Sequence, residues 1–421
     1  MSKKWILMVC WAIFPILVIS GCRGISGKQG EEETSAREKL SLMCISTVDQ
    51  EIMRDALSEF NESNTYEVEI EVEYYGLEAY KTELARRMAV NEEPDLFFSW
   101  QSGFLESYVN REKVYRLNDF LEQDEFWEEA FDQEDFGEVT FRGNVYGIPT
   151  TKCITVVYYN KALFDQYQVS VPKTYQEFLE TCAVFQKAGI VPLYMNSIPW
   201  NAGQLFLAIL NSVCGKELIQ YKNLEEIPWT GESFLKAAQM FQELYQEGYV
   251  PEDFLGTEGE SMSSGDTAMQ LSGNWFALWK DEEYGVFLLP AVNEENDAIA
   301  VGGGDRCFAI SEKCKNPEAA FGFLKLFSSE KYQSRVLYEE SNIPARKLEV
   351  DKERMLPMQA DCLGYMEQAE QYCSYMDVRF GMEFGDLFNE SAQAILSGED
   401  CMEVLETLEK YATEEREETA S

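Results

Sequence analysis

The chain has 421 residues, more than one hydrophobic core ordinarily organises, so we expect two domains. Its 75 acidic and 35 basic residues give a formal net charge of −40, which excludes a nucleic-acid partner because phosphate contacts need clustered Lys and Arg. The sequence contains no histidine, and this excludes Ser-His-Asp and Cys-His catalysis and histidine metal sites. We attribute most of the charge to solubility, and recruitment of a cationic ligand such as a polyamine is an alternative.

Eleven cysteines are spread along the chain. None forms a Cys-x-x-Cys pair, so the spacing predicts no zinc or redox centre. Nine cysteines follow Cys22, and because nine is odd, at least one thiol stays unpaired within the chain. We expect most of them to be buried as small apolar side chains.

Residues 1–21 have the features of an export signal, two lysines and then an apolar run at 5–19 that is short for a membrane span. The run ends in Ile19–Cys22, which resembles a lipoprotein signal-peptidase box with Cys22 as the lipidated residue, the carrier of palmitate. An uncleaved N-terminal anchor is the alternative. Residues 22–38, rich in Gly, Ser, Glu and Lys, predict a flexible tether. We therefore expect an extracytoplasmic protein, lipid-anchored to the outer face of the cell membrane.

The first folded segment alternates strands and helices. The patterns predict strands at 40–45, 68–74 and 94–100 and helices at 50–63 and 77–90. This order is typical of a parallel α/β sheet, whose ligands bind at loops past the carboxyl ends of the strands. Trp100 and Gln101 occupy such a loop, and a packed core indole is the alternative for Trp100.

Residues 144–178 are predicted to leave one compact lobe and enter another. Two extended segments, 145–149 and 154–159, are joined by a short polar stretch, which predicts an interdomain crossing. Beyond it the patterns predict a strand at 192–195, an amphipathic helix at 232–247, a strand at 285–290 that crosses back, a third crossing at 342–346, helices at 356–375 and 383–396 and a charged, frayed tail at 414–421.

Four motifs stand out in this part of the chain. They are a Tyr-Tyr-Asn-Lys turn at 158–161, a Val-Pro-Lys-Thr helix start at 171–174, a Gly-Asn-Trp turn at 273–275, and three glycines at 302–304 followed by a Phe-Ala-Ile-Ser strand at 308–311 and an Asn-Pro helix start at 316–317. Together they resemble the bacterial extracytoplasmic solute-binding proteins of ABC importers, the carbohydrate-binding family that includes maltose-binding protein. No Gly-Lys-Ser/Thr follows the three glycines, so a phosphate loop is excluded.

The resemblance implies a periplasmic-binding-protein-like fold of two discontinuous α/β lobes joined by hinge strands. Lobe 1 would comprise 39–150 and 291–341, and lobe 2 would comprise 151–290 and 342–413. The resemblance also implies a monomer without catalytic residues or cofactors, whose partners are a carbohydrate and the ABC permease subunits in the membrane. A lipid-anchored glycoside hydrolase and a scaffold lipoprotein are the alternatives, and the three crossings argue against a scaffold.

Sugar recognition requires flat aromatic rings for the C–H face of the sugar, and amides, carboxylates or guanidinium groups for its hydroxyls. Side chains of these types lie in the loops where the resemblance implies the cleft: Trp275, Asp305, Trp200, Asn201, Trp100, Gln101 and Arg346. The motifs support Trp275, at a helix start facing the cleft, and Asp305 most strongly. For Trp200 and Arg346 a structural role is the alternative.

Overall fold

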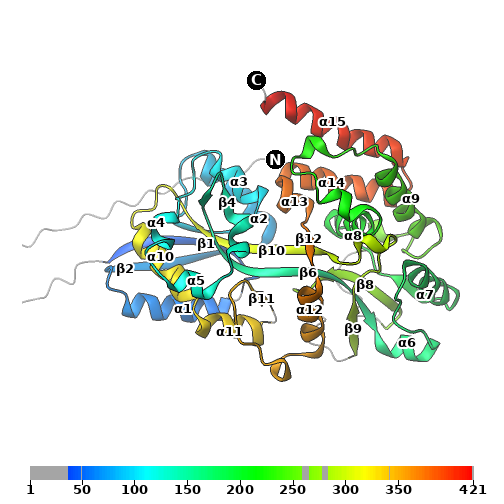
Figure 1. Cartoon of the computed structure of the whole chain (residues 1–421), viewed down its shortest axis with the longest axis horizontal. Helices are drawn as coiled ribbons and strands as arrows, with labels where there is room; N and C mark the ends of the chain where they lie inside the picture. Colours follow the sequence, from blue (N-terminus) through cyan, green and yellow to red (C-terminus); the bar gives the residue numbers. More distant parts are fainter. Residues whose placement is uncertain (1–36, 49, 258–264, 277–282, 341, 420–421) are drawn as a thin grey trace, which may run out of the picture. The chain divides into compact units, whose positions relative to one another are not determined.

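The computed structural model describes residues 37–48, 50–257, 265–276, 283–340 and 342–419. The predicted leader and almost all of the predicted tether lie outside the described residues. From Glu38 to Ser421 the chain forms one compact unit (Figure 1). Within the described residues, no helix is both long and apolar enough to cross a bilayer.

The first lobe is built on a parallel sheet, as the alternation of elements predicted. β1 (Glu38–Ile45) lies between β2 (Val68–Tyr75) and β3 (Leu96–Trp100) and pairs with both in parallel. Its main helices are α1 (Gln50–Ser63), α2 (Leu77–Ala89), α3 (Gly103–Val109), α10 (Pro317–Phe327) and α11 (Glu330–Tyr338). Its core combines side chains from residues 40–148 with others from 307–345, so this lobe is discontinuous in sequence.

The second lobe is built around α8 (Pro199–Leu218), which is buried along nearly its whole length because it is apolar on all sides. Its other elements are α6 (Lys161–Tyr167), α7 (Tyr175–Lys187), β7 (Val191–Leu193), α9 (Glu232–Gln246), β8 (Thr267–Gly273), β9 (Tyr284–Phe287), α13 (Met376–Phe380), α14 (Met382–Leu396) and α15 (Cys401–Thr419). Figure 1 shows α14 and α15 beside α8 and α9. This core also draws on separated stretches of the chain, so the two-lobe fold is confirmed.

Two long neighbouring strands, β6 (Ile148–Asn160) and β10 (Ile299–Ile310), carry the chain from one lobe to the other (Figure 1). One end of β10 pairs with β3, and one end of β6 pairs with β8 and β9. The two strands pair with each other in antiparallel fashion where the lobes meet. β11 (Ile343–Pro344) pairs with β6 at Thr151 and Lys152, beside this crossing.

Three glycines shape the middle of β10. Gly302 and Gly303 have backbone φ values of 137° and 115°, which residues with a side chain rarely adopt. A Cβ atom at Gly302 would lie 2.3 Å from the carbonyl oxygen of Cys153 on β6. The register between the strands shifts directly after these residues, between Gly304 and Cys307. The glycines therefore allow β10 to bend against β6 where the chain changes lobes.

Three predicted elements differ in the structure. The predicted return strand at 285–290 is β9, which pairs with the second-lobe end of β6, and the return to the first lobe is made by β10. The predicted helix at 356–375 ends early: α12 (Pro357–Gln368) is followed by β12 (Gln371–Cys373), which pairs with β10. α15 continues to Thr419, into the stretch that was predicted as a charged, frayed tail.

Of the nine cysteines in the described part of the chain, all but Cys314 are buried, as expected. Two predicted helix starts are also confirmed. The Thr174 hydroxyl accepts a hydrogen bond from the amide of Glu177 (3.1 Å), and the Asn316 side chain accepts one from the amide of Ala319 (3.1 Å).

Candidate functional site

Three half-buried tryptophans lie at the ends of elements from both lobes. Trp100 ends β3, Trp200 lies in the first turn of α8, and Trp275 lies in the turn after β8. The ring of Tyr375 contacts two of them edge to face, Trp200 at 5.1 Å and Trp275 at 5.9 Å between centroids. The second lobe thus holds an aromatic cluster whose centre is Tyr375, the residue just before α13.

Two polar side chains hold the hydroxyl of Tyr375 in place. It lies 2.6 Å from the Thr155 hydroxyl on β6, and the side-chain amide of Gln204 donates to it at 3.4 Å. Burial, with a smaller contribution from Cys153, raises the pKa of Tyr375, so the phenol stays neutral. The amide oxygen of Gln204 is buried and has no hydrogen-bond partner among the described residues.

Asp305 is a buried carboxylate in β10, at the crossing between the lobes. Its Oδ2 accepts a hydrogen bond from the Thr151 hydroxyl (3.2 Å) and lies 3.1 Å from the guanidinium Nε of Arg306. Burial raises the pKa of Asp305, while Arg306 and Thr151 oppose the shift. Thr151, which contacts Asp305, and Thr155, which contacts Tyr375, both lie on β6, so this strand connects the carboxylate to the aromatic cluster.

Gln101 and Trp100 approach the same crossing from the first lobe. The backbone amide of Gln101 donates to the carbonyl of Asp305 (3.1 Å), and its side-chain amide donates to the carbonyl of Arg306 (2.9 Å). Its side-chain oxygen is buried with no hydrogen-bond partner in the described part of the chain. Trp100 packs edge to face on Phe98 and Phe104 and contacts the cores of both lobes.

Asn201 and Arg346 point to other partners. The side-chain amide of Asn201, beside Trp200, donates to the side chain of Asn196 (2.7 Å), which braces the start of α8. The guanidinium of Arg346 donates to the carbonyl of Ser328 (3.2 Å) and lies 5.1 Å from the centroid of the Phe126 ring. These contacts hold Arg346 to the first lobe, and among the interactions described for it none joins it to the three tryptophans.

The structure therefore links five of the seven predicted residues to β6 or β10, directly or through Tyr375, whereas the described contacts of Asn201 and Arg346 are with other residues. Tyr375 was missed because the sequence predicted the end of a helix there. A local signal existed in Tyr372 and Cys373, which favour strands over helices and break that pattern. The helix start predicted after Trp275 falls at 277–282, outside the described residues.

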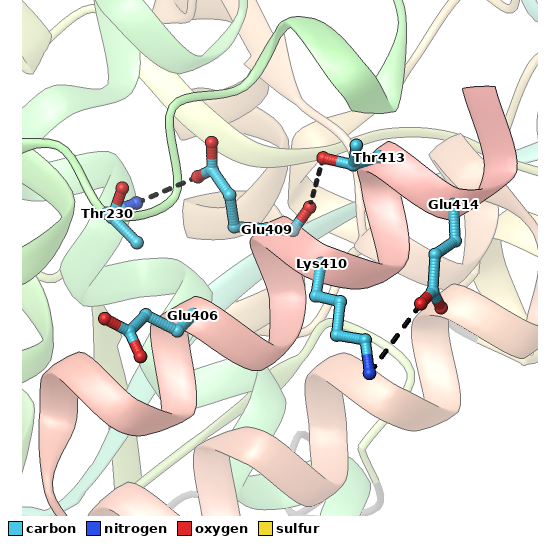
Figure 2. Close-up of a pocket in the computed structure, with 6 residues that line it drawn as sticks. All are labelled: Thr230, Glu406, Glu409, Lys410, Thr413 and Glu414. Atoms are coloured by element: carbon cyan, nitrogen blue, oxygen red, sulfur yellow. Dashed lines mark hydrogen bonds and ion pairs between the residues drawn. The ribbon is translucent and has the colours of Figure 1, made fainter. Parts of the chain in front are cut away.

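A separate groove of about 430 Å³ lies along α15, and its lining includes none of the seven predicted residues. Figure 2 shows its lining: Thr230, Glu406, Glu409, Lys410, Thr413 and Glu414. Glu409 accepts a hydrogen bond from the amide of Thr230 (3.1 Å), and Lys410 pairs with Glu414 (3.7 Å). The lining contains no aromatic ring. Within the described residues no group of His, Cys, Asp or Glu is arranged to hold a metal ion.

Comparison with known proteins agrees with this architecture. The osmoprotective compounds-binding protein GgtB of Synechocystis sp. is 23% identical over 425 residues, covering 94% of this chain and 97% of that protein. The galactooligosaccharide-binding protein of Bacillus subtilis is 27% identical over 216 residues, covering 48% of this chain and 50% of that protein. The solved structure of a chitin oligosaccharide binding protein superposes with a TM-score of 0.81 at 20% identity, covering 90% of this chain and 98% of the other, which shows a shared fold.

A sequence profile of bacterial extracellular solute-binding proteins matches residues 46–334, more than half of the chain. The match spans both lobes and includes Trp100, Trp200, Trp275 and Asp305. With two lobes, crossing strands and this match, the chain belongs to the family of bacterial extracellular solute-binding proteins.

Proposed function

We propose that this chain is the extracytoplasmic substrate-binding subunit of an ABC importer, which captures a neutral sugar or oligosaccharide between its lobes and delivers it to a membrane permease. The observation that carries this proposal is the aromatic cluster of Trp200, Tyr375 and Trp275, which β6 connects to the buried carboxylate of Asp305. The names of the relative from Bacillus subtilis and of the chitin oligosaccharide binding protein support the ligand class.

The chemistry of the cluster suits a sugar. Half-exposed tryptophan rings accept the C–H face of a pyranose, which hides apolar surface from water. Asp305 retains acceptor capacity for ligand hydroxyls, and the buried amide oxygens of Gln101 and Gln204 have no donors of their own among the described residues. Sugar hydroxyls are donors of the kind that such oxygens require. We place Asn201 at the edge of the site and leave Arg346 outside it.

Retention of the intact ligand is part of the proposal. A glycoside hydrolase requires a pair of carboxyl groups across the scissile bond, whereas the described partners of Asp305 are a hydroxyl and a guanidinium. These partners hold Asp305 as a fixed acceptor. We therefore assign Asp305 to sugar recognition and not to catalysis.

Isothermal titration calorimetry tests the ligand class. We expect a member of a panel of maltose, raffinose, chitobiose and xylobiose to bind, and chromatography of the mixture afterwards to recover that sugar unchanged. Spermidine forms a separate arm of the experiment because the net charge is −40. Tight spermidine binding without sugar binding would replace the carbohydrate by a cationic ligand, and hydrolysed sugar would replace the binding protein by an enzyme.

We also propose a monomer held at the outer face of the cell membrane by a lipid on Cys22. The signal-like leader and the Ile19–Cys22 box motivate this location. The family match supports an extracytoplasmic site of action. A tether of the length predicted at 22–38 would keep the folded part within reach of the permease.

A further inference from the structure

The two lobes touch where α3 of the first lobe meets α13 of the second (Figure 1). Gly103 is the first residue of α3. A Cβ atom at this position would lie 2.7 Å from the carbonyl oxygen of Arg379 and 2.8 Å from the amide nitrogen of Gly381. Both neighbours are backbone atoms, which cannot turn aside as a flexible side chain can. Any side chain at position 103 would therefore push α3 and α13 apart.

Each half of this contact is anchored in its own lobe. On the first side, Phe104 and Leu105 are buried in the core that includes β1. On the second side, Met376 and Val378 are buried in the core that includes α8, and the guanidinium of Arg379 donates to the carbonyl of Leu218 (3.2 Å). The contact thus joins two well-packed bodies, so a change in the angle between the lobes must open or close it.

A first-lobe cation lies near this contact. The ammonium of Lys81 on α2 lies 5.8 Å from the centroid of the Trp100 ring. Burial raises the pKa of Asp377 on α13 and of Asp386 on α14, and the charge of Lys81 opposes part of this shift in each. A first-lobe cation thus stabilises second-lobe carboxylates across the contact. Trp100 also packs on Phe104, next to Gly103, so closing the contact carries Trp100 toward the second lobe.

We propose that Gly103, packed against Arg379 and Gly381, is the closing contact of the two lobes, and that its lack of a side chain sets how far they close on a bound sugar. The inference rests on the proposed function, because a ligand that does not draw the lobes together gives this contact no role in binding. Its consequence is that a residue that touches no sugar controls affinity. Gly103 is a positioning residue, which acts through Trp100 and the closed geometry.

Gly103→Ala tests the proposal, and Gly76→Ala is its matched control. Gly76 also lies in the first lobe, at the start of α2, with an extended backbone and no heavy atom within 4 Å of an added Cβ. Each variant is titrated with maltose, raffinose, chitobiose and xylobiose, and small-angle scattering is recorded with and without sugar. For a sugar that binds the wild-type protein, we expect about ten-fold weaker binding to Gly103→Ala and a radius of gyration that stays larger, with the control unchanged.

Hydrogen exchange of the sugar-free proteins supplies a readout that needs no ligand. We expect the backbone amides of residues 376–385 to exchange faster in Gly103→Ala than in the wild type or the control, while those of β6 and β10 keep their rates. Equal exchange in all three proteins overturns the proposal. Faster exchange throughout, with a lower melting temperature, also overturns it, because it identifies permanent packing. If none of the four sugars binds the wild type, the proposed function loses support, while the exchange result still decides on the contact.

Discussion

Tyr375 contacts both kinds of side chain that a sugar site needs, aromatic rings and polar groups. Its ring contacts Trp200 and Trp275, and its hydroxyl is fixed by Thr155 and Gln204. A ring held at both its edge and its hydroxyl does not lose rotamer freedom when a ligand arrives, so the aromatic surface is formed before binding. A tryptophan of this preformed surface should therefore matter for binding, whereas a core tryptophan should matter for stability.

Trp275→Ala should abolish most sugar binding with little change in the stability of the unliganded protein. Truncation of a desolvated aromatic anchor costs about 2 kcal/mol, or roughly thirty-fold in affinity. Trp229 is the matched control, because it is fully buried in the second-lobe core against Phe234 and Phe384. Trp229→Ala should lower the free energy of unfolding by about 3–5 kcal/mol and spare binding by the folded fraction. Calorimetric titration and thermal melts measure both. A Trp275→Ala protein that melts much earlier yet binds normally would move Trp275 to the core.

Asp377 should make stability depend on pH in the reverse of the usual sense for a carboxyl. Burial raises its pKa from the ordinary value of 3.8 to about 6, so the folded state favours its protonated form. The stability that the protonated Asp377 side chain contributes to the folded state is complete below the unfolded-state pKa. It is lost as the pH rises through about 6, because the buried carboxyl then ionises. Asp377→Asn keeps the oxygen that accepts from the Val378 amide. Melting curves from pH 4 to 7 should show the variant gaining stability relative to the wild type as the pH rises. A constant difference would contradict this.

At the scale of elements, strong periodicity was enough to predict most of the helices and strands, whereas the two-lobe arrangement was predicted from the family resemblance. The strict alternation in β2 and the apolar faces of α1 and α9 were correct because these elements bury one face against a core. β12 was missed because it is three residues long and exists only through its pairing with β10, far away in sequence. Tyr375 was missed as a site residue for the same reason, because it follows β12 and its position depends on that strand. Local patterns carry no information about such partners.

The glycines of β10 give a prediction for a whole element. Gly302→Ala should lower the free energy of unfolding by about 1–3 kcal/mol, because the added Cβ meets the Cys153 carbonyl and the φ value is unfavourable for alanine. Gly364→Ala is the control: this glycine lies inside α12 with nothing within 4 Å of an added Cβ, so alanine should be neutral or stabilising by about 0.5–1 kcal/mol. Urea unfolding measures the two differences. Equal effects would mean that β10 does not need its glycines.

At the scale of the whole molecule, the two lobes determine where the site forms, and the net charge determines how the surface interacts with a membrane. The lobes explain why residues as distant in sequence as Trp100, Asp305 and Tyr375 converge, since β6 and β10 bring both cores to one crossing. The net charge of −40 explains none of this geometry, but it repels the folded part from anionic lipid headgroups. The protein surface therefore supplies no general electrostatic attraction to a membrane, so the attachment that we propose depends on the lipid at Cys22.

Cys22→Ser should release the protein from membranes. Without the thiol there is no acceptor for the lipid, and a strongly acidic protein has no other attraction to an anionic surface. Cys10→Ser is the control, because Cys10 lies within the predicted leader, upstream of the Ile19–Cys22 box, and should leave attachment intact. Fractionation of cells after a high-salt wash, followed by mass spectrometry of the mature N-terminus, distinguishes the forms. We expect the wild type and Cys10→Ser in the membrane fraction with a lipidated first residue and Cys22→Ser in the soluble fraction. A Cys22→Ser protein that still partitions fully with membranes would show that the leader is an uncleaved anchor, because an apolar segment retained in the chain needs no lipid to hold it there.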